Sequence, residues 1–153
     1  MFIKNIKNSK IVNIRHIGKT IANNKTNRIC LHDNHNDTDQ GMLIQQKRNY
    51  FYKPKKNLTS NQTFIILRGE LLILILNNKG DIIKKVRLNN KNNLICRIKK
   101  NTYHCDIALK NNTLHYETTT HSFKKRKLQY LNNKSYEKFL NNLKKILKRK
   151  DEK

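Results

Sequence analysis

The feature that most constrains this chain is its one long apolar run, NQTFIILRGELLILILNNKG, at residues 61–80. Two stretches rich in Ile, Leu and Phe are separated there by Arg68, Gly69 and Glu70. The run ends in Asn, Lys and Gly, and Asn and Gly tolerate the positive φ of a hairpin turn. The run therefore predicts two strands, the second of which ends in a hairpin turn at residues 77–81.

The chain from residue 42 to about 119 continues this pattern. Short stretches rich in Ile, Leu, Tyr, Phe and Thr alternate with Asn, Lys and Gly, which is typical of strands joined by turns. The stretches are MLIQQ, NYFYK, TFIIL, ELLILIL, DIIKKVRL, LICRI, HCDIAL and LHYETT. Strands at this spacing predict an all-β sandwich or barrel. We expect Phe64, Ile66, Leu72 and Leu74 to be among its core residues.

The two ends of the chain differ from this middle. Residues 1–28 are polar with isoleucines three to five positions apart, which favours an extension with a short helix or with a strand and a helix. SYEKFLNNLKKILKRK, from Ser135 to Lys150, has an apolar stripe at helical spacing. We expect a helix with Ser135 as N-cap that packs its stripe on the barrel. The expected order is extension 1–28, barrel 29–123 and basic helical tail 124–153.

The composition is strongly basic. The 153 residues include 34 Lys and Arg against 10 Asp and Glu, a net charge of +24. Such a charge is typical of partners of nucleic acids or anionic membranes. Lys, Asn and Ile are abundant here, and all three have AT-rich codons. An AT-rich coding sequence is therefore a second explanation for the positive charge. The lysines are scattered and arginine is scarce, which disfavours nucleic-acid binding. The amphipathic basic tail leaves open docking on a membrane or an acidic partner.

Cysteine usage and apolar patterning bear on the compartment. Cys30, Cys96 and Cys105 form no CxxC motif, so neither a disulfide framework nor a zinc knuckle is indicated, and we expect reduced, mostly buried thiols. The N-terminus has no continuous apolar stretch of the signal-peptide kind. The segment 64–76 is too short and too charged to span a bilayer. We therefore expect a cytoplasmic protein.

Motif spacing in the middle of the chain resembles that of cupin barrels. Cupins carry two histidines spaced HxH on one strand, then a glutamate four residues on, then a glycine after six more. Lys55, Asn57, Gln62 and Gly69 reproduce these intervals. His104, at the end of KKNTYH, stands where the second cupin motif has its last histidine.

More specifically, the chain resembles the WbuC-type cupins, small proteins often encoded among surface-polysaccharide genes. The resemblance covers about residues 24–123. It runs through NKTNRICLH, DTDQGMLI, NYFYKPKKN, TFIILRGEL, NNKGDI and LHYETTTHSF. It implies a cupin β-barrel or jelly roll whose interior holds Lys55, Asn57, Gln62 and His104, since residues i and i+2 of a strand share a face.

The residue types at these positions predict no metal and no other cofactor. Lysine is cationic, Asn and Gln are weak ligands, and the single imidazole of His104 does not hold a transition metal. We expect Lys55 to hold a phosphate or carboxylate, the amides to bond hydroxyls, and His104 to act as acid or base. A rebuilt metal site is the less favoured alternative. It would draw on His32, His35, Cys105, His115 and Glu117.

Three classes of function follow. In the first, the barrel binds or modifies a sugar or sugar phosphate. In the second, it is a non-catalytic scaffold whose basic tail docks on an acidic partner or membrane. The third, a basic nucleic-acid-associated protein, rests on charge alone. Fold analogy favours a homodimer. The residues leave open whether the protein is an enzyme.

Overall fold

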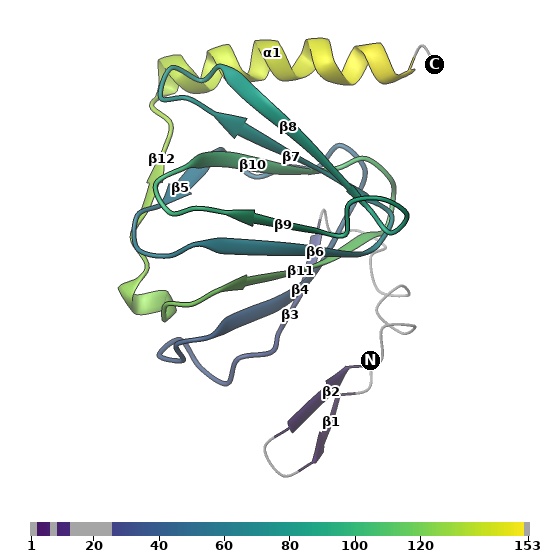
Figure 1. The fold of residues 1–153 in the computed structure, drawn as a ribbon, viewed down its shortest axis with the longest axis vertical. Helices are drawn as coiled ribbons and strands as arrows, with labels where there is room; N and C mark the ends of the chain where they lie inside the picture. The colour runs from purple at the N-terminus through teal and green to yellow at the C-terminus, as the bar shows by residue number, and fades with distance from the viewer. Residues whose placement is uncertain (1–2, 7–8, 13–25, 152–153) are drawn as a thin grey trace.

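The computed structural model describes residues 3–6, 9–12 and 26–151. Two antiparallel five-stranded sheets face one another and form a jelly roll, so the predicted all-β class is confirmed (Figure 1). Sheet I contains, in spatial order, β12 (Leu128–Tyr130), β5 (Lys55–Asn57), β10 (Tyr103–Ala108), β7 (Glu70–Leu76) and β8 (Ile82–Asn89). Sheet II contains β3 (Thr26–Cys30), β4 (Gln40–Gln46), β11 (Thr113–Thr119), β6 (Gln62–Arg68) and β9 (Ile95–Ile98).

The described residues form four further elements outside these two sheets. A short 3-10 helix, η2, spans Phe123–Lys125, and the C-terminal helix α1 spans Asn133–Asp151. Near the N-terminus, β1 (Ile3–Ile6) and β2 (Ser9–Val12) pair as a hairpin. The rest of the predicted extension up to residue 25 lies outside the described residues. The strands of the two sheets run from Thr26 to Tyr130, and so extend beyond the expected barrel range 29–123 at both ends.

The apolar run at 61–80 crosses from one sheet to the other. Its first half is β6 in sheet II and its second half is β7 in sheet I, and they do not pair with each other. Gly69 makes the crossing at φ +82°, a conformation that side chains disfavour. A Cβ at Gly69 would also lie 2.7 Å from Thr113 Oγ1. The RGE triplet is therefore the point where the chain changes sheets.

The predicted turn at 77–81 is confirmed. It joins β7 to its neighbour β8, and Gly80 adopts φ +81°. The Asn77 amide donates to the Asp81 carbonyl at 3.0 Å, and the Gly80 amide donates to the Asn77 carbonyl at 3.1 Å.

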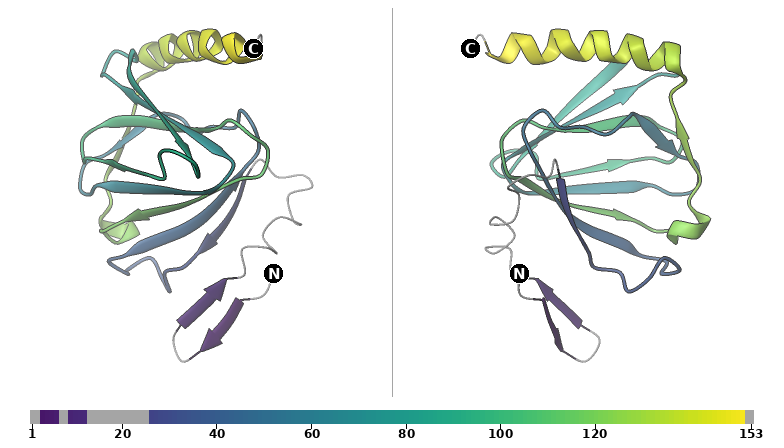
Figure 2. Two further views of the ribbon diagram at one scale, coloured as in Figure 1. Left: turned by 45° about the vertical axis from the view of Figure 1, so that its right-hand side comes forward. Right: turned by 180° about the vertical axis from the view of Figure 1, so that it is seen from behind.

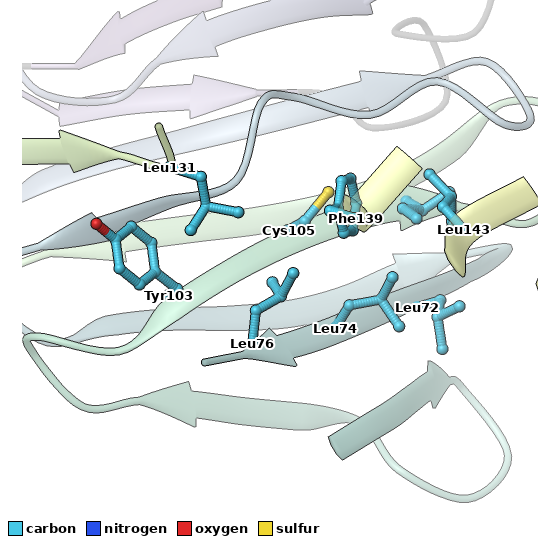
Figure 3. Close-up of a cluster of buried hydrophobic side chains, with 9 residues drawn as sticks. Leu72, Leu74, Leu76, Tyr103, Cys105, Leu131, Phe139 and Leu143 are labelled. Carbon is cyan, nitrogen blue, oxygen red and sulfur yellow. The ribbon is translucent and has the colours of Figure 1, made fainter. Parts of the chain in front are cut away.

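The molecule has two main apolar cores, one on each face of sheet I. Phe64 and Ile66 of β6 pack between the sheets, where inward residues of β7 such as Ile73 meet them. Leu72 and Leu74 point the other way, beneath α1 (Figure 3). All four predicted core residues are buried. Because β7 is covered on both faces, its sequence after Glu70, LLILIL, is apolar without alternation.

Helix α1 lies across the outer face of sheet I (Figure 2). Phe139 and Leu143 are buried there, so the apolar stripe of the tail packs on the barrel as expected. The predicted N-cap was wrong. The helix begins two residues earlier, and Asn132 Oδ1 accepts the Ser135 amide at 2.9 Å. Ser135 Oγ instead donates to the Asn78 carbonyl at 3.0 Å and ties the helix to the β7–β8 turn.

Two other expectations need correction. NYFYK does not form the strand that we expected. Within it, only Phe51 makes an isolated β-bridge, to Ile107. Asn49 just precedes this bridge at φ 61°, and Pro54 follows it without an N–H, so a regular ladder cannot form. All three cysteines are free as expected, but only Cys105 is buried, while Cys96 is half-buried and Cys30 is exposed. No helix in the described part of the chain is long and apolar enough to cross a bilayer.

Candidate functional site

The space between the sheets is lined by polar as well as apolar side chains. His104 and Asp106 on β10 pair with Ile75 and Ile73, and therefore share their inward face. His115 and Glu117 face inward from β11 in the same way. The buried polar residues of this interior, each at most 5% exposed, are Gln46, Gln62, His104, Asp106, His115, Glu117 and Thr119. So many buried polar groups in one small barrel require an explanation.

Phe64 lies at the centre of this set. Its ring centroid is 6.0 Å from that of His104 and 5.9 Å from that of His115. It is also the cross-strand partner of Glu117 in the β6–β11 ladder. One fully buried phenylalanine thus brings a histidine of sheet I close to a histidine and a carboxylate of sheet II.

His104 and Gln62 form a hydrogen-bonded pair. His104 Nδ1 lies 3.0 Å from the Thr102 carbonyl, which can only accept, so Nδ1 carries the proton. In a neutral ring Nε2 is then an acceptor, yet the atom placed 3.1 Å from it is another acceptor, Gln62 Oε1. Only the NH₂ of Gln62 can donate to it. We therefore orient that amide with its NH₂ towards His104, which leaves the Gln62 carbonyl oxygen unpaired.

Burial keeps His104 neutral. Removal from water lowers the pKa of His104 below its usual value, because the charged form loses solvation. The Thr102 hydrogen bond opposes this shift, and the nearby charge of Lys55 lowers the pKa further. A neutral His104 can accept a proton only at Nε2, so a ligand that gives it one has to displace the Gln62 amide from that nitrogen.

The two interior carboxylates differ in their hydrogen bonding. Asp106 accepts the Gln46 Nε2–H at 2.9 Å. Glu117 accepts no hydrogen bond from any residue that the structure describes. Its carboxylate is therefore free to accept a hydrogen bond from a ligand hydroxyl.

His115 has the least favourable environment of the set. Its side chain is fully buried, and neither ring nitrogen has a hydrogen-bond partner among the described residues. Its cross-strand neighbours are Ile44 and Ile66, with Phe64 on its flank. Burial lowers the pKa of His115.

Of the four pocket residues predicted from sequence, the structure brings His104 and Gln62 into contact and places Lys55 beside them. Lys55 is the cross-strand partner of His104, so the two side chains share a face. Asn57 is buried, but its amide belongs to a local turn. Its Nδ2 donates to Ser60 Oγ at 2.7 Å and its Oδ1 accepts the Ser60 amide at 3.2 Å.

A cluster of cationic and aromatic side chains joins β3, an edge strand of sheet II, to β5 of sheet I and to the segment that precedes β5. We call Arg28, Tyr50, Tyr52 and Lys55 the rim cluster. The Arg28 guanidinium is 4.7 Å and the Lys55 ammonium 5.9 Å from the centre of the Tyr52 ring. Tyr52 also donates its hydroxyl to Thr26 Oγ1 of β3 at 3.0 Å, which links β3 to the segment that precedes β5.

The residues considered for a rebuilt metal site lie in separate places. His32 and His35 lie in the β3–β4 connection with ring centroids 6.5 Å apart. Cys105 points away from the interior, under α1, and donates to the Tyr52 carbonyl at 3.2 Å. In the described ranges no three His, Cys, Asp or Glu side chains form a group that could hold a metal ion.

Sequence reasoning missed Arg28, Gln46 and Asp106 as partners of this site, and it considered Glu117 only as a metal ligand. Asp106 stands two residues after His104, and strand alternation alone puts it on the same face. Arg28 and Tyr52 meet only through the fold, so no local pattern identifies their contact.

Solved structures share this fold at low sequence identity. KdgF from Halomonas sp. superposes with a TM-score of 0.53 at 13% identity, over 65% of this chain and 83% of KdgF. CapF, solved with the inhibitor 3-isopropenyl-tropolone, gives a TM-score of 0.62 at 13% identity, over 71% of this chain and 33% of CapF. Procruciferin, an 11S globulin from Brassica napus, gives 0.50 at 15% identity, over 61% of this chain and 23% of the globulin.

This chain thus spans most of KdgF but only a third of CapF and under a quarter of the globulin. No protein-family model and no curated protein sequence matches it. The likeness establishes a cupin-like jelly roll, as the motif spacing predicted, and assigns no family.

Proposed function

We propose that this chain is a cupin-fold protein that binds a sugar or sugar phosphate at the mouth of its barrel without a metal. Its place would be among the WbuC-type cupins of surface-polysaccharide biosynthesis, which its motif order resembles. One observation carries the proposal. The ring of His104, a neutral histidine hydrogen-bonded to Gln62, lies 6.0 Å from that of Phe64, and Glu117, which accepts no hydrogen bond from a described residue, is the cross-strand partner of Phe64.

Each group has a role suited to a polyhydroxyl ligand. The free oxygens of Glu117 accept hydroxyl protons, and the Gln62 carbonyl accepts another. His104 is the candidate acid or base, and its lowered pKa favours the base form at neutral pH. Lys55, on the same face, holds an anionic substituent. Asn57 is omitted from the proposed site because its amide is engaged in the turn to Ser60.

The metal-free part of the proposal is tested by elemental analysis of protein made without a metal-binding tag. We expect no stoichiometric Zn, Fe, Ni or Mn. About one such ion per chain, lost in His104→Ala, would show that the barrel holds a metal after all.

Ligand binding is tested by titrating neutral and phosphorylated monosaccharides into the protein while its NMR spectrum is recorded. We expect shifts of the His104 ring signals and of the Phe64 amide. Glu117→Gln should weaken binding about 10-fold, the effect of one charge-assisted hydrogen bond. Glu137→Gln removes the same charge at an exposed position of α1 and should have no effect. If no sugar perturbs these signals, the sugar-binding proposal fails and the scaffold alternative remains.

The scaffold alternative is restricted by the position of α1. Because Phe139 and Leu143 are buried against sheet I, only the lysine-rich side of the helix is available to an acidic partner or a membrane. A cytoplasmic location and a homodimer remain parts of the proposal, to be tested by fractionation and by light scattering.

A further inference from the structure

We propose that the rim cluster is the binding site for an anionic group, a phosphate or carboxylate, of a monosaccharide whose ring lies at the barrel mouth. This inference rests on the proposed function and specifies its substrate class. It adds Arg28 and Tyr52, which sequence motifs did not indicate, as the residues that select an anionic sugar over a neutral one.

The first observation is convergence from both sheets. Arg28 lies on β3, an edge strand of sheet II, and its pairing with Ile44 places it on the inward face, since Ile44 pairs in turn with His115. Lys55 lies on β5 of sheet I, on the inward face with His104. Both cations reach the ring of Tyr52, at 4.7 Å and 5.9 Å from its centre. Two positive charges are therefore gathered around one aromatic ring.

The second observation is that neither Arg28 nor Lys55 forms an ion pair with a described residue, although the more distant charges of Glu117 and Asp106 act on Arg28. No carboxylate of the described residues lies within salt-bridge distance of Arg28 or Lys55. Other cations in this chain have one, as Lys138 does with Asp81 at 2.6 Å. Arg28 is exposed and Lys55 half-buried, so a solute can reach both.

The third observation concerns the chemistry of the groups in the rim cluster. A guanidinium binds a phosphate or carboxylate through two parallel hydrogen bonds, and an ammonium adds a point charge. Tyr50 packs edge-on against Tyr52 with ring centroids 5.1 Å apart, which provides an aromatic surface for the apolar face of a sugar. Asp106 and Glu117 lie behind this surface and repel an anion. The ligand should therefore lie with its anionic group at the rim and its hydroxyls inward.

The competing explanation is that Arg28 and Lys55 only offset the charges of Asp106 and Glu117 from a distance. It predicts that added anions do not prefer the rim over the rest of this basic surface. The two explanations differ in where an anion binds.

The experiment follows the Arg Nε–Hε NMR signals while inorganic phosphate, glucose, glucose 6-phosphate and glucuronate are added separately. The chain has only eight arginines, and the Arg28 signal is assigned by its loss in Arg28→Gln. The test variant is Arg28→Gln/Lys55→Gln. The matched control, Lys84→Gln/Lys85→Gln, removes the same charge from exposed positions of the edge strand β8. Thermal melts verify that each variant folds.

We expect phosphate, glucose 6-phosphate and glucuronate to shift the Arg28 signal with saturation. The rim variant should weaken glucose 6-phosphate at least about 10-fold and the control less than about 2-fold, and glucose should bind equally to both. Arg28→Lys should fall between, because the charge stays and the two-point contact is lost. The phosphorylated and carboxylated sugars distinguish which anionic group the site prefers.

The inference is overturned if the rim and control variants lose anion affinity equally, or if anions leave the Arg28 signal unchanged. If sugars bind but their anionic forms keep their advantage in the rim variant, this inference fails while the proposed function stands. If phosphate binds at Arg28 but no sugar perturbs His104, the proposed function fails and an anion site remains.

Discussion

The two buried histidines should respond in opposite ways to the same substitution. His115→Leu should stabilise the protein, whereas His104→Leu should destabilise it. Both rings are inward-facing and almost fully buried, and leucine is close to histidine in volume. The difference lies in their hydrogen bonds. His104 has two partners, Thr102 and Gln62, while neither nitrogen of His115 has a partner among the described residues.

The size of each effect follows from these contacts. An unsatisfied buried polar group costs about 1–3 kcal/mol, so replacing His115 among Ile44, Ile66 and Phe64 should recover an amount in that range. His104→Leu instead leaves the Thr102 carbonyl and the Gln62 amide without their hydrogen-bond partner. This loss should lower the free energy of unfolding by about 1–3 kcal/mol. At about 2–4 °C per kcal/mol for a chain of this size, the two melting temperatures should separate by roughly 4–24 °C.

The pH dependence gives an independent check. Burial lowers the pKa of both histidines in the folded state, so below the unfolded value of about 6.5 the unfolded chain binds more protons. Stability should therefore fall as pH decreases from about 6.5, by up to about 1.4 kcal/mol per pH unit for each histidine. His115→Leu should remove one of these contributions. Two carboxyl groups titrate below this window. Burial raises the pKa of Glu70, but Arg87 and Lys110 outweigh it and lower that pKa, and hydrogen bonds from Lys138 and Asn77 lower the pKa of Asp81.

Urea unfolding of the three proteins at pH 7.5 and 5.5, followed by circular dichroism, measures these quantities. A loss of more than about 1 kcal/mol in His115→Leu at pH 7.5 would refute the reasoning. It would show that the His115 nitrogens have a partner, such as an ordered water, that contributes to stability.

Two further predictions concern the attachment of α1. Phe139→Ala should lower the free energy of unfolding by about 3–5 kcal/mol, because Phe139 is fully buried beneath the helix, and hydrogen exchange along α1 should accelerate. The exposed Lys144→Ala is its control, and protection that survives Phe139→Ala would argue against the packing. Gly80→Ala should cost at least about 2 kcal/mol in chemical denaturation, since φ is +81° and the new Cβ would overlap the Ser135 carbonyl oxygen. Lys79→Ala in the same turn should be nearly neutral, and similar stability of both variants would place the turn away from the helix.

Those parts of the fold that depend on local chemistry were predictable from sequence. The turn at Gly80 and the apolar stripe of α1 are read from neighbouring residues. The N-cap illustrates the limit of such reading. Asn132 and Ser135 are both good capping residues, and the choice between them depends on Asn78, whose carbonyl accepts the Ser135 hydroxyl from 57 positions away.

The candidate site was less predictable because it depends on which face of each strand turns inward. All six residues of β10 are buried, so burial alone does not distinguish Asp106 from Cys105. The distinction arises from register and from α1, which covers the outer face and encloses Cys105. Arg28 of β3 and Tyr52 of the segment that precedes β5 meet only through the fold, and nothing near either residue in sequence marks the contact.

The cupin spacing persists here without the cupin ligands for a physical reason. Gln62 to Gly69 is the length of β6 followed by the residue at which the chain crosses between sheets. The interval from Lys55 to Gln62 joins β5 to β6. Lys55 of β5 pairs with His104, and Gln62 of β6 is hydrogen-bonded to it. These intervals are set by strand length and sheet crossing, not by a metal. They identify the fold, whereas the chemistry has to be inferred from the side chains that face inward. These are an amide-bound neutral histidine, and a glutamate and two rim cations that form no ion pair with a described residue.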